Sequence, residues 1–222
     1  FVFIGASLIF VVLFLALAVT SPGRSGRYQV LHYGGALYAL SIFAAALILF
    51  GSGMEFTEAL LAGPSISAPI LCLMDLLGAI CCMIVANFRR KGANPWPVTE
   101  LIPILYLIIK LIFNFKEWSI DPVILDYCVI LFALIFVLLA FHRTAGFVFD
   151  QGKPRVSLFF SLCAVYFSAA AMMDGMADLS FSTLVTYCGY LVWQLPVILC
   201  LSVPHAPDPV PEKAGKRSKK RA

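Results

Sequence analysis

The chain has 222 residues, of which 61% are hydrophobic and only 13% are charged, and its mean hydropathy is +0.94. Soluble globular domains carry about 25% charged residues, so this composition excludes a soluble globular domain. The formal net charge of +4 is spread over several segments instead of forming one basic patch, and therefore gives no indication of a nucleic-acid partner.

Seven long apolar runs follow one another along the chain. A membrane-spanning helix needs about 20 predominantly apolar residues to cross the hydrocarbon core. The runs cover residues 1–20, 31–52, 66–87, 99–115, 122–142, 157–178 and 182–203. The sequence therefore predicts an all-α fold, a polytopic integral membrane bundle of seven transmembrane helices that occupies residues 1–203 and contacts the lipid bilayer.

The basic residues indicate the orientation of this bundle. Fourteen of the 16 Lys and Arg residues follow the first, third, fifth and seventh runs: Arg24, Arg27, Arg89, Arg90, Lys91, Arg143, Lys153, Arg155, Lys213, Lys216, Arg217, Lys219, Lys220 and Arg221. Cationic segments remain in the cytoplasm during insertion, which predicts that the N-terminus is outside and the C-terminus inside. The short loops favour a multi-pass protein of a bacterial cytoplasmic membrane.

Residues 204–222 contain four prolines followed by a basic cluster, which predicts a disordered cytoplasmic tail. A basic residue near an anionic membrane surface contributes about 1 kcal/mol of attraction, so we expect this tail to contact anionic lipid.

The seven runs also fit an internal repeat. Two parallel three-helix halves, formed by the first three and the last three runs, would be joined by the fourth run. Phe43 and Gly51 in the second run have the same spacing as Phe167 and Gly175 in the sixth. Parallel repeats of this kind occur in small transporters.

Two ionisable side chains lie well inside apolar runs, where charge is costly and commonly functional. Asp75 lies roughly 14 Å below the outer end of its run, and Lys110 roughly 8 Å below the end of the next one. Because short loops bring consecutive helices together, we expect Asp75 and Lys110 to pair. Such a pair fits either a substrate site or a structural ion pair that fixes helix register.

The outer side of the bundle is acidic. Asp126 and Asp174 each lie about four residues, roughly 6 Å, from the outer ends of their runs. Five further acids occupy the outer gaps: Glu55, Glu58, Glu117, Asp121 and Asp178. Convergent carboxylates concentrate counter-ions, which predicts a cation or proton site at this end. The alternative is a set of separate carboxylates that reach back to the membrane surface.

The sixth run contains a stripe of small residues at helical spacing: Ser157, Ser161, Ala164, Ser168, Ala171 and Gly175. Small residues allow neighbouring helices to approach closely. The stripe therefore predicts that this helix is packed inside the bundle, which would turn Asp174 inward.

Gln194 lies near the centre of the seventh run, two residues before Pro196. Proline cannot donate to the carbonyl of Val192, so a free acceptor is expected there. This polar patch would bind a neutral or cationic group, as interrupted helices of transporters do. The alternative is a proline kink in which Gln194 bonds to a neighbouring helix.

These observations favour a small transporter or channel for a cation or small polar solute. Its candidate substrate-binding residues are Asp75, Lys110, Asp126, Asp174 and Gln194. The alternative is a non-catalytic membrane subunit or assembly factor that binds a membrane protein partner or a second copy of the chain.

An enzyme is not expected, because the sequence lacks an H-E-x-x-H motif, a G-x-S-x-G motif and a glycine-rich phosphate loop. No metal site or cofactor is expected either, since the seven cysteines all fall in apolar runs. One enzyme alternative remains, a lipid-modifying activity that uses His142 and Arg143 at the inner leaflet.

Overall fold

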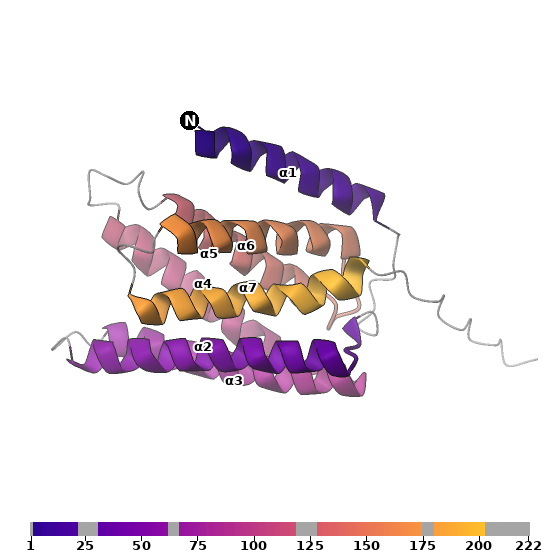
Figure 1. Ribbon diagram of the computed structural model, residues 1–222. Helices are drawn as coiled ribbons and strands as arrows, with labels where there is room; N and C mark the ends of the chain where they lie inside the picture. Colours follow the sequence, from indigo (N-terminus) through magenta and orange to yellow (C-terminus); the bar gives the residue numbers. More distant parts are fainter. Residues whose placement is uncertain (1, 22–30, 62–66, 119–127, 175–179, 203–222) are drawn as a thin grey trace, which may run out of the picture.

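A computed structural model of the chain describes residues 2–21, 31–61, 67–118, 128–174 and 180–202. The described residues form seven α-helices and no strand, which confirms the predicted all-helical bundle (Figure 1). The helices are α1 (Val2–Thr20), α2 (Gly35–Leu61), α3 (Ser67–Lys91), α4 (Pro97–Trp118), α5 (Cys128–Ala145), α6 (Pro154–Asp174) and α7 (Phe181–Ser202).

Six of these helices, α2 to α7, are long and apolar enough to cross a membrane. The first helix, α1, has a shorter apolar stretch, Gly5–Thr20. Helical segments of this kind satisfy their backbone hydrogen bonds internally, which is what a lipid environment requires. The protein is therefore a multi-pass membrane protein in contact with the lipid bilayer.

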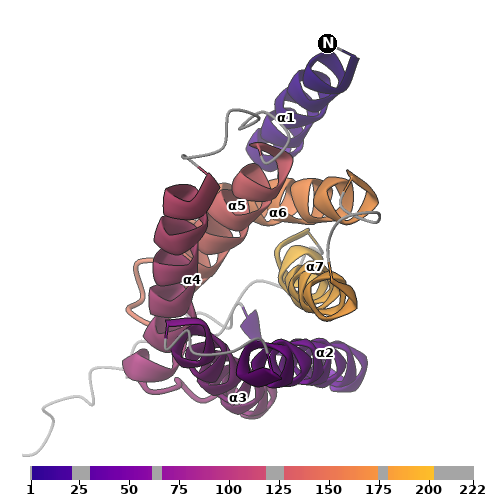
Figure 2. The same ribbon diagram turned by 90° about the vertical axis from the view of Figure 1, so that its left-hand side faces the viewer.

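The helices α2 to α7 form a closed ring. Each of them packs against the next one in sequence, and α7 packs against α2 to close the ring. Figure 2 shows this arrangement along the bundle, with α7 between α6 and α2. The centre is filled by side chains from all six helices, including Ala44, Val85, Leu107, Phe141 and Trp193.

Close contact between α2 and α7 depends on two glycines. A Cβ atom at Gly51 would lie only 2.9 Å from the backbone carbonyl oxygen of Ser182. A Cβ atom at Gly189 would lie 2.9 Å from the backbone nitrogen of Ile48. These distances are shorter than real Cβ contacts, so glycine at both positions allows the two helices to approach.

The small-residue stripe of α6 is buried as predicted. Ser157, Ser161, Ala164, Ser168 and Ala171 all lie inside the bundle. The last member of the stripe, Gly175, lies outside the described residues.

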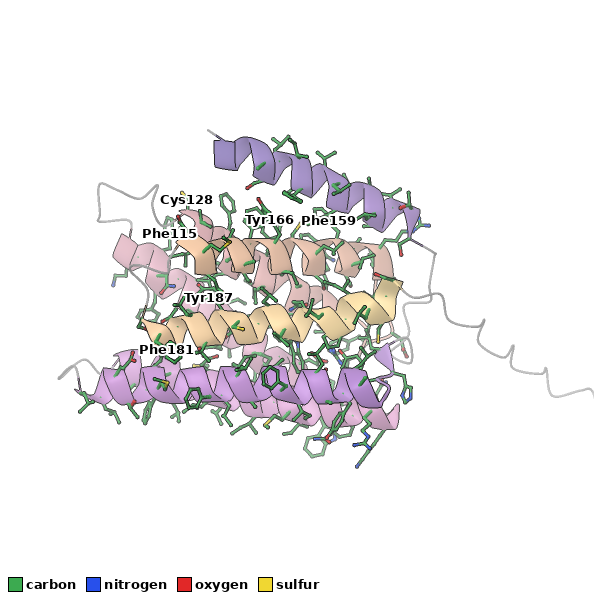
Figure 3. All side chains as sticks on the ribbon, viewed as in Figure 1. Phe115, Cys128, Phe159, Tyr166, Phe181 and Tyr187 are labelled. Carbon is green, nitrogen blue, oxygen red and sulfur yellow. The ribbon has the colours of Figure 1, made fainter. Side chains whose placement is uncertain are left out.

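The first helix lies outside the ring, against α6 (Figures 1 and 2). Tyr166 of α6 makes this contact: its ring packs 4.8 Å from the ring of Phe10, and its hydroxyl lies 3.1 Å from the Ser7 hydroxyl. Figure 3 shows Tyr166 between the two helices. The two predicted halves are thus packed differently, because α5 contacts α6 along its length, whereas α1 has its main contact with α6 and not with α2.

The predicted runs and the observed helices differ most at the outer end of α2. The second apolar run ends at residue 52, whereas the helix continues to Leu61. Glu55 and Glu58, which the sequence places in an outer loop, therefore lie on the last turns of a helix. The membrane orientation and the basic tail remain predictions, and residues 203–222 lie outside the described residues.

Candidate functional site

Asp75 of α3 is at the centre of a buried polar cluster in the half of the bundle that is predicted to be the outer one. Its side chain is 1% exposed. It accepts hydrogen bonds from the Ser52 hydroxyl of α2, at 2.5 Å, and from the Tyr190 hydroxyl of α7, at 2.9 Å. Both donors are themselves buried. Three helices therefore converge on one carboxylate.

A second carboxylate, that of Glu55, lies on α2, about one turn after Ser52. Glu55 accepts a 3.5 Å hydrogen bond from the Lys110 ammonium of α4 through its Oε2 atom. Both side chains are 15% exposed. The Lys110 Nζ atom also lies 5.5 Å from the ring centroid of Tyr106, within the range of a cation–π contact. We call Ser52, Glu55, Asp75, Lys110 and Tyr190 the mid-bundle cluster.

One oxygen of the mid-bundle cluster is left without a donor. Glu55 Oε1 is buried and meets no hydrogen-bond donor among the described residues. A buried polar atom without a partner destabilises a fold and therefore calls for an explanation. A bound cation or proton would provide one.

The prediction of a direct Asp75–Lys110 ion pair is wrong in the structure. Lys110 pairs with Glu55, and Asp75 is held by two hydroxyl groups instead. The reason is the extra length of α2, which carries Glu55 inward from the expected outer loop and places it beside Lys110. The two predicted residues do belong to one cluster. Its other members are Ser52 and Tyr190, which the sequence did not indicate, and Glu55, which the sequence placed among the outer acids and not beside Lys110.

Gln194 of α7 follows the structural alternative. It is buried, and its Oε1 atom accepts a 3.2 Å hydrogen bond from the Ser161 hydroxyl on the α6 stripe. The helix α7 continues through Pro196 to Ser202. Gln194 therefore joins α7 to α6 and does not belong to the mid-bundle cluster.

Only one member of the predicted outer pair of aspartates, Asp174, lies in the described part of the chain, so the pairing stays a prediction. Asp174 is the last residue of α6 and its side chain is exposed, so the small-residue stripe does not turn it inward. Asp126 lies outside the described residues.

A buried ion pair that the sequence did not predict lies at the other end of the ring. The Arg89 side chain of α3 is fully buried, and its Nη2 atom donates to Glu100 of α4 at 2.9 Å. Its Nη1 atom donates to the Tyr33 hydroxyl at 2.6 Å, and its guanidinium lies 5.8 Å from the ring centroid of Trp193. We call the Arg89–Glu100 pair, together with the neutral Tyr33 that bonds to it, the inner ion pair.

The inner ion pair also fixes the segment before α2. The Tyr33 amide donates to the carbonyl oxygen of Arg89 at 3.1 Å. Burial raises the pKa of the Tyr33 hydroxyl, and the Arg89 guanidinium lowers it in part, so the phenol remains a neutral acceptor at ordinary pH. The sequence contained one signal for this pair, since Glu100 is the only acid in the first turn of any of the seven helices.

An aromatic layer lies between the mid-bundle cluster and the inner ion pair. Phe141 of α5 stacks on Trp193 at 6.2 Å and meets Tyr190 edge-on at 6.3 Å. Tyr190 belongs to the mid-bundle cluster and Trp193 contacts Arg89, so this layer links both groups. Tyr187, one turn before Tyr190, is labelled on α7 in Figure 3.

A metal centre finds no support in the geometry. Within the described ranges, no group of three or more His, Cys, Asp or Glu side chains is arranged to hold a metal ion. None of the seven cysteines, all of which lie in the described ranges, forms a disulfide. An apolar cavity of about 390 Å³ lies between α4 and α5, and its lining, which includes Leu111, Phe115 and Phe132, suits only an apolar occupant.

The fold and the buried charges define an integral membrane protein whose helical bundle encloses a polar cluster. Comparison with protein-family models, curated proteins and solved structures gave no match. The function must therefore be inferred from the cluster itself.

Proposed function

We propose that the protein is a small transporter for a monovalent cation or proton, alone or coupled to a small polar solute, with its site at the mid-bundle cluster. The observation that carries the proposal is Asp75, a carboxylate 1% exposed at the convergence of α2, α3 and α7. Ionisable side chains inside a membrane bundle are rare because they are costly, and they commonly mark ion or proton pathways.

The charges of the mid-bundle cluster support a cation. With each side chain counted in its ionised form, Asp75 and Glu55 contribute two negative charges and Lys110 contributes one positive charge. The sum is −1, which one monovalent cation or one proton neutralises. The carboxylate, hydroxyl and phenol oxygens of the cluster are hard ligands of the kind that alkali cations and protons prefer.

Packed side chains at the inner end of the ring support a conformation in which a cation at Asp75 has no exit on the inner side. Phe141 and Trp193 form a stacked aromatic layer, and below it the Arg89–Glu100 pair is closed by Tyr33. A cation that reaches Asp75 from the outer side would be stopped by this layer. Transport therefore requires a second conformation in which the inner end opens, as alternating access demands.

The experiment is a flux assay with purified protein in liposomes. Imposed gradients of H⁺, Na⁺ and K⁺ would be tested in turn with a trapped pH dye and with tracer cations. Wild-type protein should dissipate at least one gradient, and Asp75→Asn should reduce that flux by at least about tenfold, because the neutral amide removes the charge that binds the cation.

Asp174→Asn is the matched control, since it makes the same chemical change on an exposed residue at the end of α6. It should retain the wild-type flux. Equal flux through wild type and Asp75→Asn, with both proteins folded, would contradict the proposed site.

The alternative function, a non-catalytic subunit of a larger membrane complex, is favoured by α1. This helix lies outside the ring, and most of its apolar side chains are exposed, including Leu8, Ile9 and Val12. Such a helix offers a face to a partner as well as to lipid. Absence of flux for every tested cation, with a partner retained during purification only when α1 is intact, would favour this function.

A further inference from the structure

A polar cavity lies at the inner end of the bundle, away from the mid-bundle cluster. It has a volume of about 380 Å³. It is bounded by the start of α4, the end of α5 and the connection from α5 to α6, through Leu101, His142, Arg143, Phe149, Gln151 and Lys153 together with Ala145 and Gly146. Its size suits a phosphate-bearing headgroup.

The ionisable side chains that line the cavity are all of basic types. Arg143, Lys153 and His142 line it, and none of the described lining residues is acidic. Asp150, the acid in the same connection, is exposed and does not line the cavity. The α6 helix begins directly after Lys153, so the positive end of its dipole adds to the attraction for an anion.

Basic residues in the last turn of a helix are also expected from the helix dipole and from membrane orientation. The geometry of Arg143 goes beyond that expectation. Its guanidinium lies 5.8 Å from the ring centroid of Phe160 on α6. Its Nε atom is buried, yet it meets no acceptor within the described part of the chain. A buried donor beside a cavity is matched by a ligand that supplies an acceptor oxygen.

Two exposed apolar side chains complete the cavity. Leu101 on α4 and Phe149 in the connection to α6 have about half of their surface exposed. A soluble anion gains nothing from such neighbours, whereas the glycerol and upper acyl chain of a lipid would cover them. This combination of basic and apolar lining matches the cytoplasmic-side pockets that bind anionic lipid headgroups.

We propose that this cavity binds the phosphate of one anionic phospholipid, with Arg143 and Lys153 as its charged ligands. The guanidinium of Arg143 donates to the phosphate oxygens, and Lys153 contributes a second positive charge at the rim. Leu101 and Phe149 contact the lipid below its headgroup. This site is separate from the basic tail that the sequence predicts to contact lipid.

The test is native mass spectrometry of the full chain, which resolves individual bound lipids. Phosphatidylglycerol and phosphatidylcholine would be titrated into wild type, Arg143→Gln/Lys153→Gln and the matched control Arg90→Gln/Lys91→Gln. The control removes the same two charges from exposed residues at the same end of the bundle. We expect the first bound phosphatidylglycerol to be weakened by about tenfold or more in the cavity variant alone.

Competition with soluble anions distinguishes a lipid headgroup from a soluble phosphate ester as the natural ligand of the cavity. Inorganic phosphate and glycerol 3-phosphate should leave the first bound phosphatidylglycerol in place at millimolar concentration. Displacement by glycerol phosphate at an affinity equal to that of the lipid would overturn the lipid assignment in favour of a soluble phosphate ester. Equal loss of lipid in the cavity variant and in the control, or no loss in either, would overturn the site itself.

A folding failure of the double variant is avoided by Lys153→Gln alone, because Lys153 is exposed and removal of its charge leaves Arg143 in place. This variant should still weaken the first phosphatidylglycerol by several-fold. Arg143→Lys should weaken it as well, since an ammonium loses the forked geometry of the guanidinium. Unchanged affinity in both variants would contradict the proposal.

Discussion

The bundle holds two buried charged groups, and they are built differently. The inner ion pair joins one cation to one anion, and its Arg89 side chain is surrounded by Glu100, Tyr33 and the Trp193 ring. The mid-bundle cluster has two carboxylates for one ammonium, and one oxygen of Glu55 meets no donor among the described residues. With every Asp, Glu, Lys and Arg side chain counted in its ionised form, the first group sums to zero and the second to −1.

This difference indicates separate roles. A pair of one cation and one anion gives the fold register, because it ties the end of α3 to the start of α4 and to the segment before α2. An excess of carboxylates over ammonium groups, with one oxygen that meets no donor among the described residues, supports the proposed cation site. We therefore expect substitutions in the inner ion pair to change stability, and substitutions in the mid-bundle cluster to change cation binding.

The largest effect on stability is expected from Arg89→Met. The substitution leaves Glu100, which is 3% exposed, as a buried charge without its partner. The cost should be about 3–5 kcal/mol of unfolding free energy, measured by thermal or denaturant unfolding in detergent.

The double variant Arg89→Met/Glu100→Leu is the control for this effect. Because it removes both charges and keeps apolar volume, most of the stability should return. A double variant as unstable as the sum of its single changes would show that the two side chains do not act as a pair.

A smaller effect is expected from Lys110→Met, because Lys110 and Glu55 are both partly exposed. The loss should be about 1–2 kcal/mol, since a partly exposed ion pair contributes less than a fully buried one. Double-mutant cycles should give a larger coupling between Lys110 and Glu55 than between Lys110 and Asp75. The reverse order would restore the direct Asp75–Lys110 pair that the sequence suggested.

The smallest effect on stability is expected from Asp75→Asn. Ser52 and Tyr190 bond different oxygens of Asp75, so in Asn the amide oxygen accepts from one hydroxyl and the amide nitrogen donates to the other. The change also removes a buried charge, so the unfolding free energy should change by less than about 1 kcal/mol. The same unfolding measurement checks this expectation. A loss as large as that of Arg89→Met would mean that Asp75 is a structural residue.

The helices could be predicted from the sequence alone, whereas the contacts between them could not. Seven apolar runs predicted seven helices because hydropathy over about 20 residues reports directly on a membrane span. The stripe of α6 predicted a buried face because the spacing of its small residues follows the helix period. Asp75 and Gln194 stood out as polar residues in apolar runs, and both are buried.

The partners of these residues could not be predicted, because they depend on which helices meet. Glu55 was assigned to a loop, since a hydropathy pattern cannot show that a helix extends beyond its apolar part. Arg89 was counted as a loop charge that sets orientation, whereas its side chain is enclosed by α3, α4 and the segment before α2. Ring closure by α7 against α2 brings Tyr190 to Asp75 across 115 positions of sequence, and no local pattern reports that contact.

The most direct test of the central claim is the charge displaced when a cation binds at Asp75. Proteoliposomes on a solid-supported membrane would receive rapid jumps of H⁺, Na⁺ or K⁺, with wild type, Asp75→Asn and Asp174→Asn compared at equal protein density. We predict a transient current for at least one cation in wild type and in Asp174→Asn, and its loss in Asp75→Asn. A current of wild-type size in folded Asp75→Asn would contradict the assignment of the mid-bundle cluster as the cation site.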